Sequence, residues 1–320
     1  MGQSRAHAWT AFGRFATGRG FSRLAAGSAF GWPPSGRKPS CQRMAASMGT
    51  IIRIGEDDLF VRHTPLQAGR GTILFLHGLG DSSLAFDEAF SGNECADLNL
   101  VAVDLPGHGR SLPAHDGLYT LEAHAKRLAD LIGTMDLQRI TLVGHSLGGD
   151  IATVAISRHH CSRIDRLVSI EGTIAPADSF ICNRASEAAE NGFAAFESWF
   201  HQQYREETVF DKWGRDGDAG RRYYASLRFC DPASFLACAR ELFSRNQHPD
   251  WRGLSGIGAL FAALSIERHF VYGTRSLQPT TAQLVTELGI ENYALPAGHW
   301  VMADAAAEFY PLLRQITMTR

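Results

Sequence analysis

The sequence has no apolar run that approaches the roughly 18 residues needed to cross a bilayer, so it predicts no membrane-spanning helix. Its six cysteines are scattered, with no Cys-x-x-Cys pair and no histidine at a zinc-ligand spacing. This indicates reduced structural thiols in a reducing compartment.

The first fifty residues contain no Asp or Glu, although they hold seven of the 31 basic residues. All 33 acidic residues lie beyond them, and an acidic body is a poor match for nucleic acid, which binds through Lys and Arg.

Residues 1–47 differ in composition from the rest of the chain. They are rich in Arg, Ser, Ala and Gly, and they lack the compact apolar core of a secretory signal. Two interpretations stay open: an organelle transit peptide over residues 1–43, or an upstream extension of the reading frame ahead of a start at Met44 or Met48. Either way we expect a disordered N-terminal extension, and a cytoplasmic protein unless the transit peptide is genuine.

From Thr50 onward, short apolar runs alternate with segments of helical periodicity, which is typical of βαβ units and a mostly parallel sheet. The runs 72–78 and 98–107 are continuously apolar and end in Gly or Pro, as expected for strands covered on both faces. The pattern predicts further strands at 139–144, 166–172, 268–273 and 292–298. It predicts helices at 121–135, 147–160, 280–289 and 304–316.

The alternation stops between residues 175 and 265, where helical patterns occur without a parallel strand. Asp231-Pro232 marks one helix start, because an N-cap residue followed by proline precedes the periodic run 233–244. We predict a helical lid over 175–265, inserted into an α/β core formed by 48–174 and 266–320.

The predicted lid is rich in aromatic residues. We expect most of them to pack in the core and a few to line a pocket for an apolar acyl or aryl group, whereas Arg221 and Arg222 could meet an anionic substrate. The aromatic residues are Phe193, Phe196, Trp199, Phe200, Tyr204, Trp213, Tyr223 and Tyr224.

Gly144-His145-Ser146-Leu147-Gly148 matches the Gly-x-Ser-x-Gly motif between a predicted strand and a predicted helix, the context that this motif requires. The chain must turn sharply there, which exposes the hydroxyl at a helix N-terminus where backbone N–H groups favour negative charge. Three segments follow other predicted strands: His77-Gly78-Leu79-Gly80, the run 104–111, and Gly298-His299-Trp300. Together these residues resemble the α/β-hydrolase superfamily from about Thr50 to the end of the chain, apart from the lid.

The resemblance implies an α/β-hydrolase fold, with a mostly parallel central sheet flanked by helices. It implies Ser146 as nucleophile, His299 as base, and an oxyanion hole formed by the backbone N–H groups of Leu79 and Leu147, with no metal or organic cofactor. A serine at the nucleophile position argues against the aspartate chemistry of haloalkane dehalogenases and epoxide hydrolases. We expect four other polar residues to be structural, pocket-lining or turn-stabilising: His77, His108, His145 and Asp104.

The third member of the triad departs from the common pattern of this superfamily, because no Asp or Glu lies between Arg268 and Thr286, where the acid usually follows a late strand. Glu171 is the candidate instead. It lies 25 residues after Ser146, about the length of one helix, a short connection and one strand, and ends its strand on the same edge of the sheet. The segment also resembles a subgroup whose strand ends in Glu-Gly, followed by Pro and Asp. Asp178 is the alternative.

The predicted function is a serine hydrolase that cleaves an ester or related acyl bond of a small, apolar substrate. Carbon–carbon bond hydrolases and cofactor-free perhydrolases share this serine–histidine architecture and stay open as alternatives. A third alternative is a ligand-sensing protein with little turnover, which the missing acid after the late strand alone supports. The natural substrate and the oligomeric state stay open.

Overall fold

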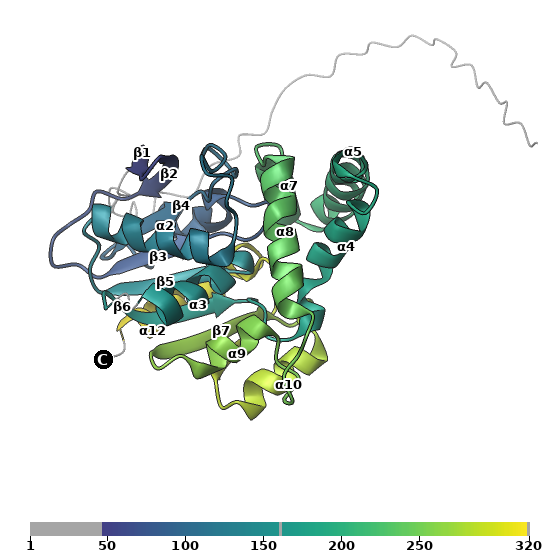
Figure 1. Ribbon diagram of the computed structural model, residues 1–320. Coiled ribbons are helices and arrows are strands. Elements are labelled where there is room, and N and C mark those ends of the chain that lie inside the picture. The colour runs from purple at the N-terminus through teal and green to yellow at the C-terminus, as the bar shows by residue number, and fades with distance from the viewer. Residues whose placement is uncertain (1–46, 160–161, 319–320) are drawn as a thin grey trace, which may run out of the picture. The chain divides into compact units, whose positions relative to one another are not determined.

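The computed structural model describes residues 47–159 and 162–318 (Figure 1). The predicted extension over residues 1–47 lies outside the described residues apart from Ser47. Within the described part, eight strands form one sheet in the order β1-β2-β4-β3-β5-β6-β7-β8. The strands are β1 (Met48–Ile54), β2 (Asp57–His63), β3 (Thr72–Leu76), β4 (Asn99–Val103), β5 (Ile140–His145), β6 (Ile164–Ile170), β7 (Glu267–Gly273) and β8 (Glu291–Leu295).

Most of the sheet is parallel, which confirms the predicted fold class. β1 and β2 form an antiparallel hairpin, and β2 pairs antiparallel with β4, where Val61 lies opposite Val103. From β4 through β3, β5, β6 and β7 to β8, every pairing is parallel. The carboxyl ends of these parallel strands therefore share one edge, where open α/β sheets place their ligand sites.

Two hydrophobic cores lie on the two faces of the sheet. In β3, Leu74 and Leu76 belong to one core while Ile73 and Phe75 belong to the other, because successive side chains of a strand point to opposite faces. The helices outside the segment between β6 and β7 are η1 (Ser83–Phe86), α1 (Asp87–Ser91), α2 (Leu121–Thr134), α3 (Leu147–His159), α10 (Pro279–Glu287), α11 (Val301–Asp304) and α12 (Ala306–Met318). Residues of α2 and α3, which lie side by side in Figure 1, complete the first core, and residues of α1 and α12 complete the second.

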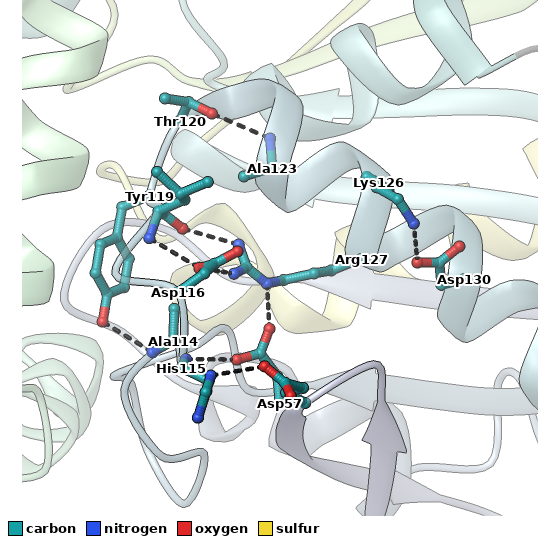
Figure 2. A network of polar contacts seen from close by, with 12 residues as sticks. Asp57, Ala114, His115, Asp116, Tyr119, Thr120, Ala123, Lys126, Arg127 and Asp130 are labelled. Carbon is teal, nitrogen blue, oxygen red and sulfur yellow. Dashed lines mark hydrogen bonds and ion pairs between the residues drawn. The ribbon is translucent and has the colours of Figure 1, made fainter.

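Arg127 of α2 anchors the β1–β2 hairpin. Its nearly buried guanidinium donates to Asp57 Oδ2 at 2.6 Å, to Asp116 Oδ1 at 2.6 Å and to the Leu118 carbonyl at 2.8 Å (Figure 2). Asp57 also accepts from the backbone N–H of His115 at 2.7 Å. Because a buried charge is stable only when it is paired and hydrogen-bonded, this network is a structural clasp between the hairpin, α2 and the loop before α2.

Between β6 and β7 the described chain is helical and contains no strand. This helical insertion consists of η2 (Pro176–Ser179), α4 (Phe180–Ala188), α5 (Phe193–Ser198), η3 (Trp199–Trp213), α6 (Gly214–Asp216), α7 (Asp218–Leu227), α8 (Pro232–Asn246) and α9 (Gly256–Ala263). In Figure 1, α4, α5, α7 and α8 gather beside the sheet. The Asp231 carboxylate caps α8 by accepting from Ser234 N at 2.8 Å, which confirms the helix start predicted from Asp231-Pro232.

The segment η3 is a π-helix of 15 residues. π-Helices usually occur as single turns inside α-helices, so a run of this length is unusual, and the sequence pattern predicts only that the segment is helical. Tyr204 and Trp213 of η3 line the cavity described below.

None of the helices in residues 47–159 and 162–318 combines the length and the apolar character that crossing a bilayer requires.

Candidate active site

Ser146 lies at the sharp turn between β5 and α3. Its φ of 50° is in the left-handed region, which is uncommon for a residue other than glycine and marks local strain. The backbone N–H of Ser146 donates to the Ile170 carbonyl at 2.8 Å. A Cβ added at Gly144 would lie 2.4 Å from the Gly148 carbonyl oxygen, and a Cβ added at Gly148 would lie 2.3 Å from the Leu76 carbonyl oxygen. The two glycines are therefore needed for the close backbone approach that exposes the serine.

His299 follows β8 and bonds to Glu171, which directly follows β6. Its Nδ1 lies 2.5 Å from Glu171 Oε2, and Glu171 is itself in the left-handed region with φ 47°. Burial works against a charged His299, but Glu171, together with Asp81 and Asp178, raises the pKa of His299 above its ordinary value. Burial likewise works against a charged Glu171, but His299 and the bonds donated to the carboxylate lower its pKa. Both shifts favour an imidazolium–carboxylate pair.

The last residue of β7 and the loop after it supply hydrogen-bond donors to Glu171 instead of an acid. The backbone N–H of Gly273 donates to Glu171 Oε1 at 2.8 Å, and the Ser276 hydroxyl donates to the same oxygen. The Glu171 N–H in turn donates to the Val271 carbonyl at 3.0 Å. The loop without Asp or Glu thus holds the carboxylate that faces His299. Sequence reasoning missed Ser276, because a single serine in a loop carries no recognisable pattern.

Leu79 and Leu147 carry the backbone N–H groups predicted for an oxyanion hole. Leu147 is the first residue of α3, so its N–H has no partner within the helix. Leu79 lines the cavity beside Ser146. The Tyr223 hydroxyl donates to the Leu79 carbonyl at 2.9 Å, and the Tyr204 hydroxyl lies 2.8 Å from that of Tyr223. A chain of phenols from the helical insertion therefore fixes the Leu79 loop.

His145 supports the His299 loop. The two ring centroids lie 4.6 Å apart, and His145 Nε2 lies 3.0 Å from the His299 carbonyl oxygen. Because a carbonyl only accepts, Nε2 carries the proton, and burial keeps the pKa of His145 well below its ordinary value, so the ring is neutral. The hydrogen bonds of the described residues include none between the Ser146 hydroxyl and His299. Such catalytic bonds often form only when substrate binds.

Asp178, the alternative acid, lines the cavity but does not bond to His299. Its Oδ2 accepts from the backbone N–H groups of Ile174 at 3.0 Å and Ala175 at 2.8 Å. Its Oδ1 accepts from the Thr281 hydroxyl at 2.7 Å. Asp178 therefore fixes the start of the helical insertion.

Three other polar residues of the motifs are held in the protein interior. His77 Nε2 accepts from Leu105 N at 2.9 Å, and burial lowers the pKa of His77 to about 4. Burial also lowers the pKa of His108 to about 3. Asp104 accepts a backbone hydrogen bond from Ser83 at 2.6 Å and holds the turn that follows β4. Buried, neutral imidazoles of this kind hold loops in place by hydrogen bonds, and they offer no positive charge to a substrate.

A cavity of about 730 Å³ opens onto Ser146, Glu171 and His299, a volume in the range of small-molecule sites. Three of the eight aromatic residues singled out in the insertion line it: Tyr204, Trp213 and Tyr223. Phe196 and Phe200 are fully buried and pack in the core. Two further aromatic residues of the cavity, Phe180 and Trp300, were not anticipated as lining residues.

The expectation that Arg221 and Arg222 could meet an anionic substrate is wrong. Arg222 donates two hydrogen bonds to the Glu88 carboxylate, both 2.7 Å long, and Arg221 donates to the Gly214 carbonyl at 3.0 Å. Neither arginine lines the cavity. Both lie on α7, where neighbouring residues point in different directions, so their adjacency in sequence gave no guide to the pocket.

Two buried carboxylates near the site were also missed. Asp150 of α3 accepts from the Thr173 N–H at 2.8 Å and from the Thr173 hydroxyl at 2.7 Å, and burial raises its pKa to about 7. Asp81 is 1% exposed, lines the cavity, and accepts from Trp300 Nε1 at 3.1 Å. The sequence signal for Asp81 was its place directly after His77-Gly78-Leu79-Gly80. In the part of the chain that the structure describes, no three His, Cys, Asp or Glu side chains are grouped to hold a metal ion.

Comparison with known proteins agrees with the fold. A family model for the alpha/beta hydrolase fold matches residues 71–215. An uncharacterized protein of Mycobacterium tuberculosis is 36% identical over 105 residues, 32% of this chain, and the chain spans only 30% of that relative's length. The 2-succinyl-6-hydroxy-2,4-cyclohexadiene-1-carboxylate synthase of Enterobacter sp. is 26% identical over 257 residues, 78% of this chain and 92% of that protein.

Among solved structures, the enol-lactonase from Burkholderia xenovorans superposes with a TM-score of 0.66 at 16% identity, covering 84% of this chain and 100% of that chain. At that identity the likeness concerns the fold. With the serine at the turn after β5, the histidine after β8 and the family model that matches residues 71–215, the chain is similar to the α/β hydrolases and has their fold.

Proposed function

We propose that the chain is a serine hydrolase that cleaves an ester or related acyl bond of a small, mainly apolar substrate through an acyl-enzyme on Ser146. The observation that carries the proposal is the 2.5 Å bond between His299 and Glu171, beside a strained Ser146 in one cavity. A carboxylate on Nδ1 keeps the proton there, which leaves Nε2 free to take a proton from a serine.

The proposed reaction begins when His299 Nε2 takes the proton of Ser146 as the serine oxygen attacks the substrate carbonyl carbon. The N–H groups of Leu79 and Leu147 donate to the oxygen that becomes negative. His299 then gives its proton to the leaving group, and the acyl-enzyme forms. A water molecule, deprotonated by His299, attacks the acyl carbon and regenerates the free serine. Glu171 stabilises the imidazolium present in both steps.

The Glu171–His299 bond also bears on the ligand-sensing alternative. That alternative depended on the absence of an acid after the late strand, and the acid proposed here comes from the preceding strand. The enol-lactonase and the carboxylate synthase have different activities in their names, so these two similar proteins do not choose a reaction or a substrate for this chain.

The test is labelling with a fluorophosphonate probe, in wild type, Ser146→Ala and His299→Ala, together with turnover of short p-nitrophenyl esters. We expect rapid labelling of the wild type, no labelling of Ser146→Ala, and labelling slowed by orders of magnitude in His299→Ala. Circular dichroism should show that all three proteins are folded. Folded wild-type protein that neither labels nor turns over esters would refute the proposal.

A further inference from the structure

Asp81 is a buried carboxylate that lines the cavity and is neither the nucleophile, the base nor the acid of the proposed acyl transfer. Its Oδ1 accepts from the backbone N–H of Ser82 at 2.8 Å, and its Oδ2 accepts from Trp300 Nε1 at 3.1 Å. The Ser226 hydroxyl also bonds to the Asp81 carboxylate. Each oxygen of an ionised carboxylate can accept about two hydrogen bonds, so these three leave acceptor capacity on a group that lines the cavity.

No cationic side chain of the described residues forms an ion pair with Asp81. Arg222 reaches it only through its charge, because its guanidinium is bound to both oxygens of Glu88. Burial raises the pKa of Asp81 to about 6, against the opposing effect of its hydrogen bonds, so most of it is ionised at neutral pH. An ionised group in such surroundings is costly unless it is paired, and a cation brought by a ligand would pair it.

Aromatic rings surround the same part of the cavity. Ring centroids of Tyr223 and Trp300 lie 4.8 Å apart, those of Trp213 and Trp300 5.6 Å, and those of Tyr204 and Trp213 6.1 Å. All four rings line the cavity that Asp81 lines. Burial raises the pKa of the Tyr204 and Tyr223 phenols, and the charge of Asp81 adds to both effects, so the carboxylate is close enough to act on them. Aromatic faces of this kind attract alkylammonium groups.

The other charged groups of the cavity do not favour an anion. Among the described residues, Arg275 is the one arginine that lines the cavity. Its guanidinium donates to the Pro296 carbonyl at 2.8 Å and to Asp304 at 3.3 Å. Glu171 and His299 form a pair of their own. Asp178 also lines the cavity, and its carboxylate accepts from the neutral donors Ile174 N, Ala175 N and the Thr281 hydroxyl. Asp81 and Asp178 thus leave negative charge in the cavity, which would repel a carboxylate-bearing substrate.

We propose that the cavity selects acyl substrates that carry a cationic group, an alkylammonium or quaternary ammonium, seated against the four aromatic rings and paired with Asp81. The inference rests on the proposed function and narrows its substrate class. The apolar chain of such a substrate would suit the mainly apolar lining, while the cation would occupy the position beside Asp81.

The test compares three p-nitrophenyl esters of equal acyl length that end in a trimethylammonium group, in its neutral tert-butyl isostere, and in a carboxylate. For the wild type we expect kcat/KM to be roughly tenfold higher for the cationic than for the neutral ester, and lowest for the anionic one. In Asp81→Asn the ratio of cationic to neutral kcat/KM should fall to near one. Asp130→Asn, which removes the same charge from an exposed site on α2 outside the cavity, should keep the wild-type ratio.

Two outcomes would overturn the inference: equal turnover of the cationic and neutral esters by the wild type, or an equal loss for both esters in Asp81→Asn. The second would make Asp81 a positioning residue for Trp300. If Asp81→Asn does not fold, the wild type alone provides the test. Phenyltrimethylammonium should then inhibit wild-type turnover of the neutral ester more strongly than its neutral isostere tert-butylbenzene does, and equal inhibition would overturn the inference. Failure of the proposed function looks different, since no ester would then be turned over and Ser146 would not be labelled.

Discussion

Glu171→Gln tests the assignment of the acid, because glutamine has the shape of glutamate and lacks its charge. In the wild type Oε1 accepts from Gly273 N and from the Ser276 hydroxyl, and Oε2 faces His299 Nδ1 at 2.5 Å. Glutamine has one oxygen and one NH₂ group. Two donors already hold the Oε1 position, so the glutamine oxygen takes that position and its NH₂ group faces His299.

The expected loss of activity follows from this arrangement. An NH₂ group only donates, so His299 Nδ1 must become an acceptor and the ring proton must move to Nε2. A ring protonated at Nε2 cannot take the proton of Ser146. In a serine–histidine–carboxylate triad this change of tautomer costs roughly 10⁴-fold in kcat. That factor corresponds to about 5 kcal/mol of activation free energy.

The pH profile adds a second readout. Burial alone would lower the pKa of His299, but Glu171 with Asp81 and Asp178 raises it above its usual value near 6.5. Acylation needs neutral His299, so wild-type kcat/KM should rise with pH through a pKa above that value. In Glu171→Gln the largest raising effect is gone, so the acid limb of the residual activity should move to lower pH.

The assay is steady-state turnover of a p-nitrophenyl ester across pH, with circular dichroism as the check of folding. Asp178→Asn is the matched control. Its carboxylate serves Ile174, Ala175 and Thr281, so we expect less than a tenfold loss of kcat. A folded Glu171→Gln with wild-type kcat, and a large loss in Asp178→Asn, would refute the assignment and make Asp178 the acid.

Three further predictions concern stability and the loop that carries Leu79. Gly148→Ala would place a Cβ 2.3 Å from the Leu76 carbonyl oxygen, so we expect the free energy of unfolding to fall by about 3 kcal/mol. Gly133→Ala lies in open space on α2 and should raise the free energy of unfolding by up to about 1 kcal/mol. Urea titration measures both, and equal effects would contradict the packing argument. The folded-state pKa of Asp81 is raised from 3.8 to about 6, so the folded state holds that proton more tightly than the unfolded state does. As the pH rises from 4 to 6, the unfolding free energy of the wild type should therefore fall by about 2 kcal/mol relative to that of Asp81→Asn. A pH-independent difference between the two proteins in thermal unfolding would rule this out. Tyr223→Phe removes the donor to the Leu79 carbonyl and the partner of the Tyr204 hydroxyl. The unfolding free energy should therefore drop by about 1–2 kcal/mol, and kcat should decrease. An unchanged kcat would show that the Tyr223 hydroxyl does not fix the Leu79 loop.

Much of the core could be predicted from the sequence because its signals are local. A continuous apolar run with a glycine at its end predicts a buried strand, and the predicted strand 139–144 corresponds to β5 (Ile140–His145) within one residue. The predicted helix 121–135 is α2 with one residue fewer. The strand predicted at 98–107 is wrong at its ends, because β4 stops at Val103 and the rest of that apolar run forms the turn held by Asp104.

The parts of the site that could not be predicted are contacts between residues far apart in the chain. Asp81 and Trp300 are separated by 219 residues, and Arg222 and Glu88 by 134. No periodicity or spacing records such pairs, because packing of the whole fold decides them. The π-helical form of η3 belongs to the same class, since its residues are compatible with an ordinary helix.

The position of the proposed acid, Glu171, suits a fold that can supply a carboxylate to His299 from either of two strands. Ser146 and Glu171 both adopt left-handed φ angles directly after adjacent strands, β5 and β6, so both side chains leave the same edge of the sheet. The loop after β7 then has only to orient the carboxylate, which Gly273 N and the Ser276 hydroxyl do. A strained residue persists only where its surroundings fix it, and Glu171 has donors on Oε1, an imidazole on Oε2 and a backbone bond to Val271. Because Gly273, Ser276 and His299 hold this one side chain, the proposed acid directly after β6 needs no second acid after β7.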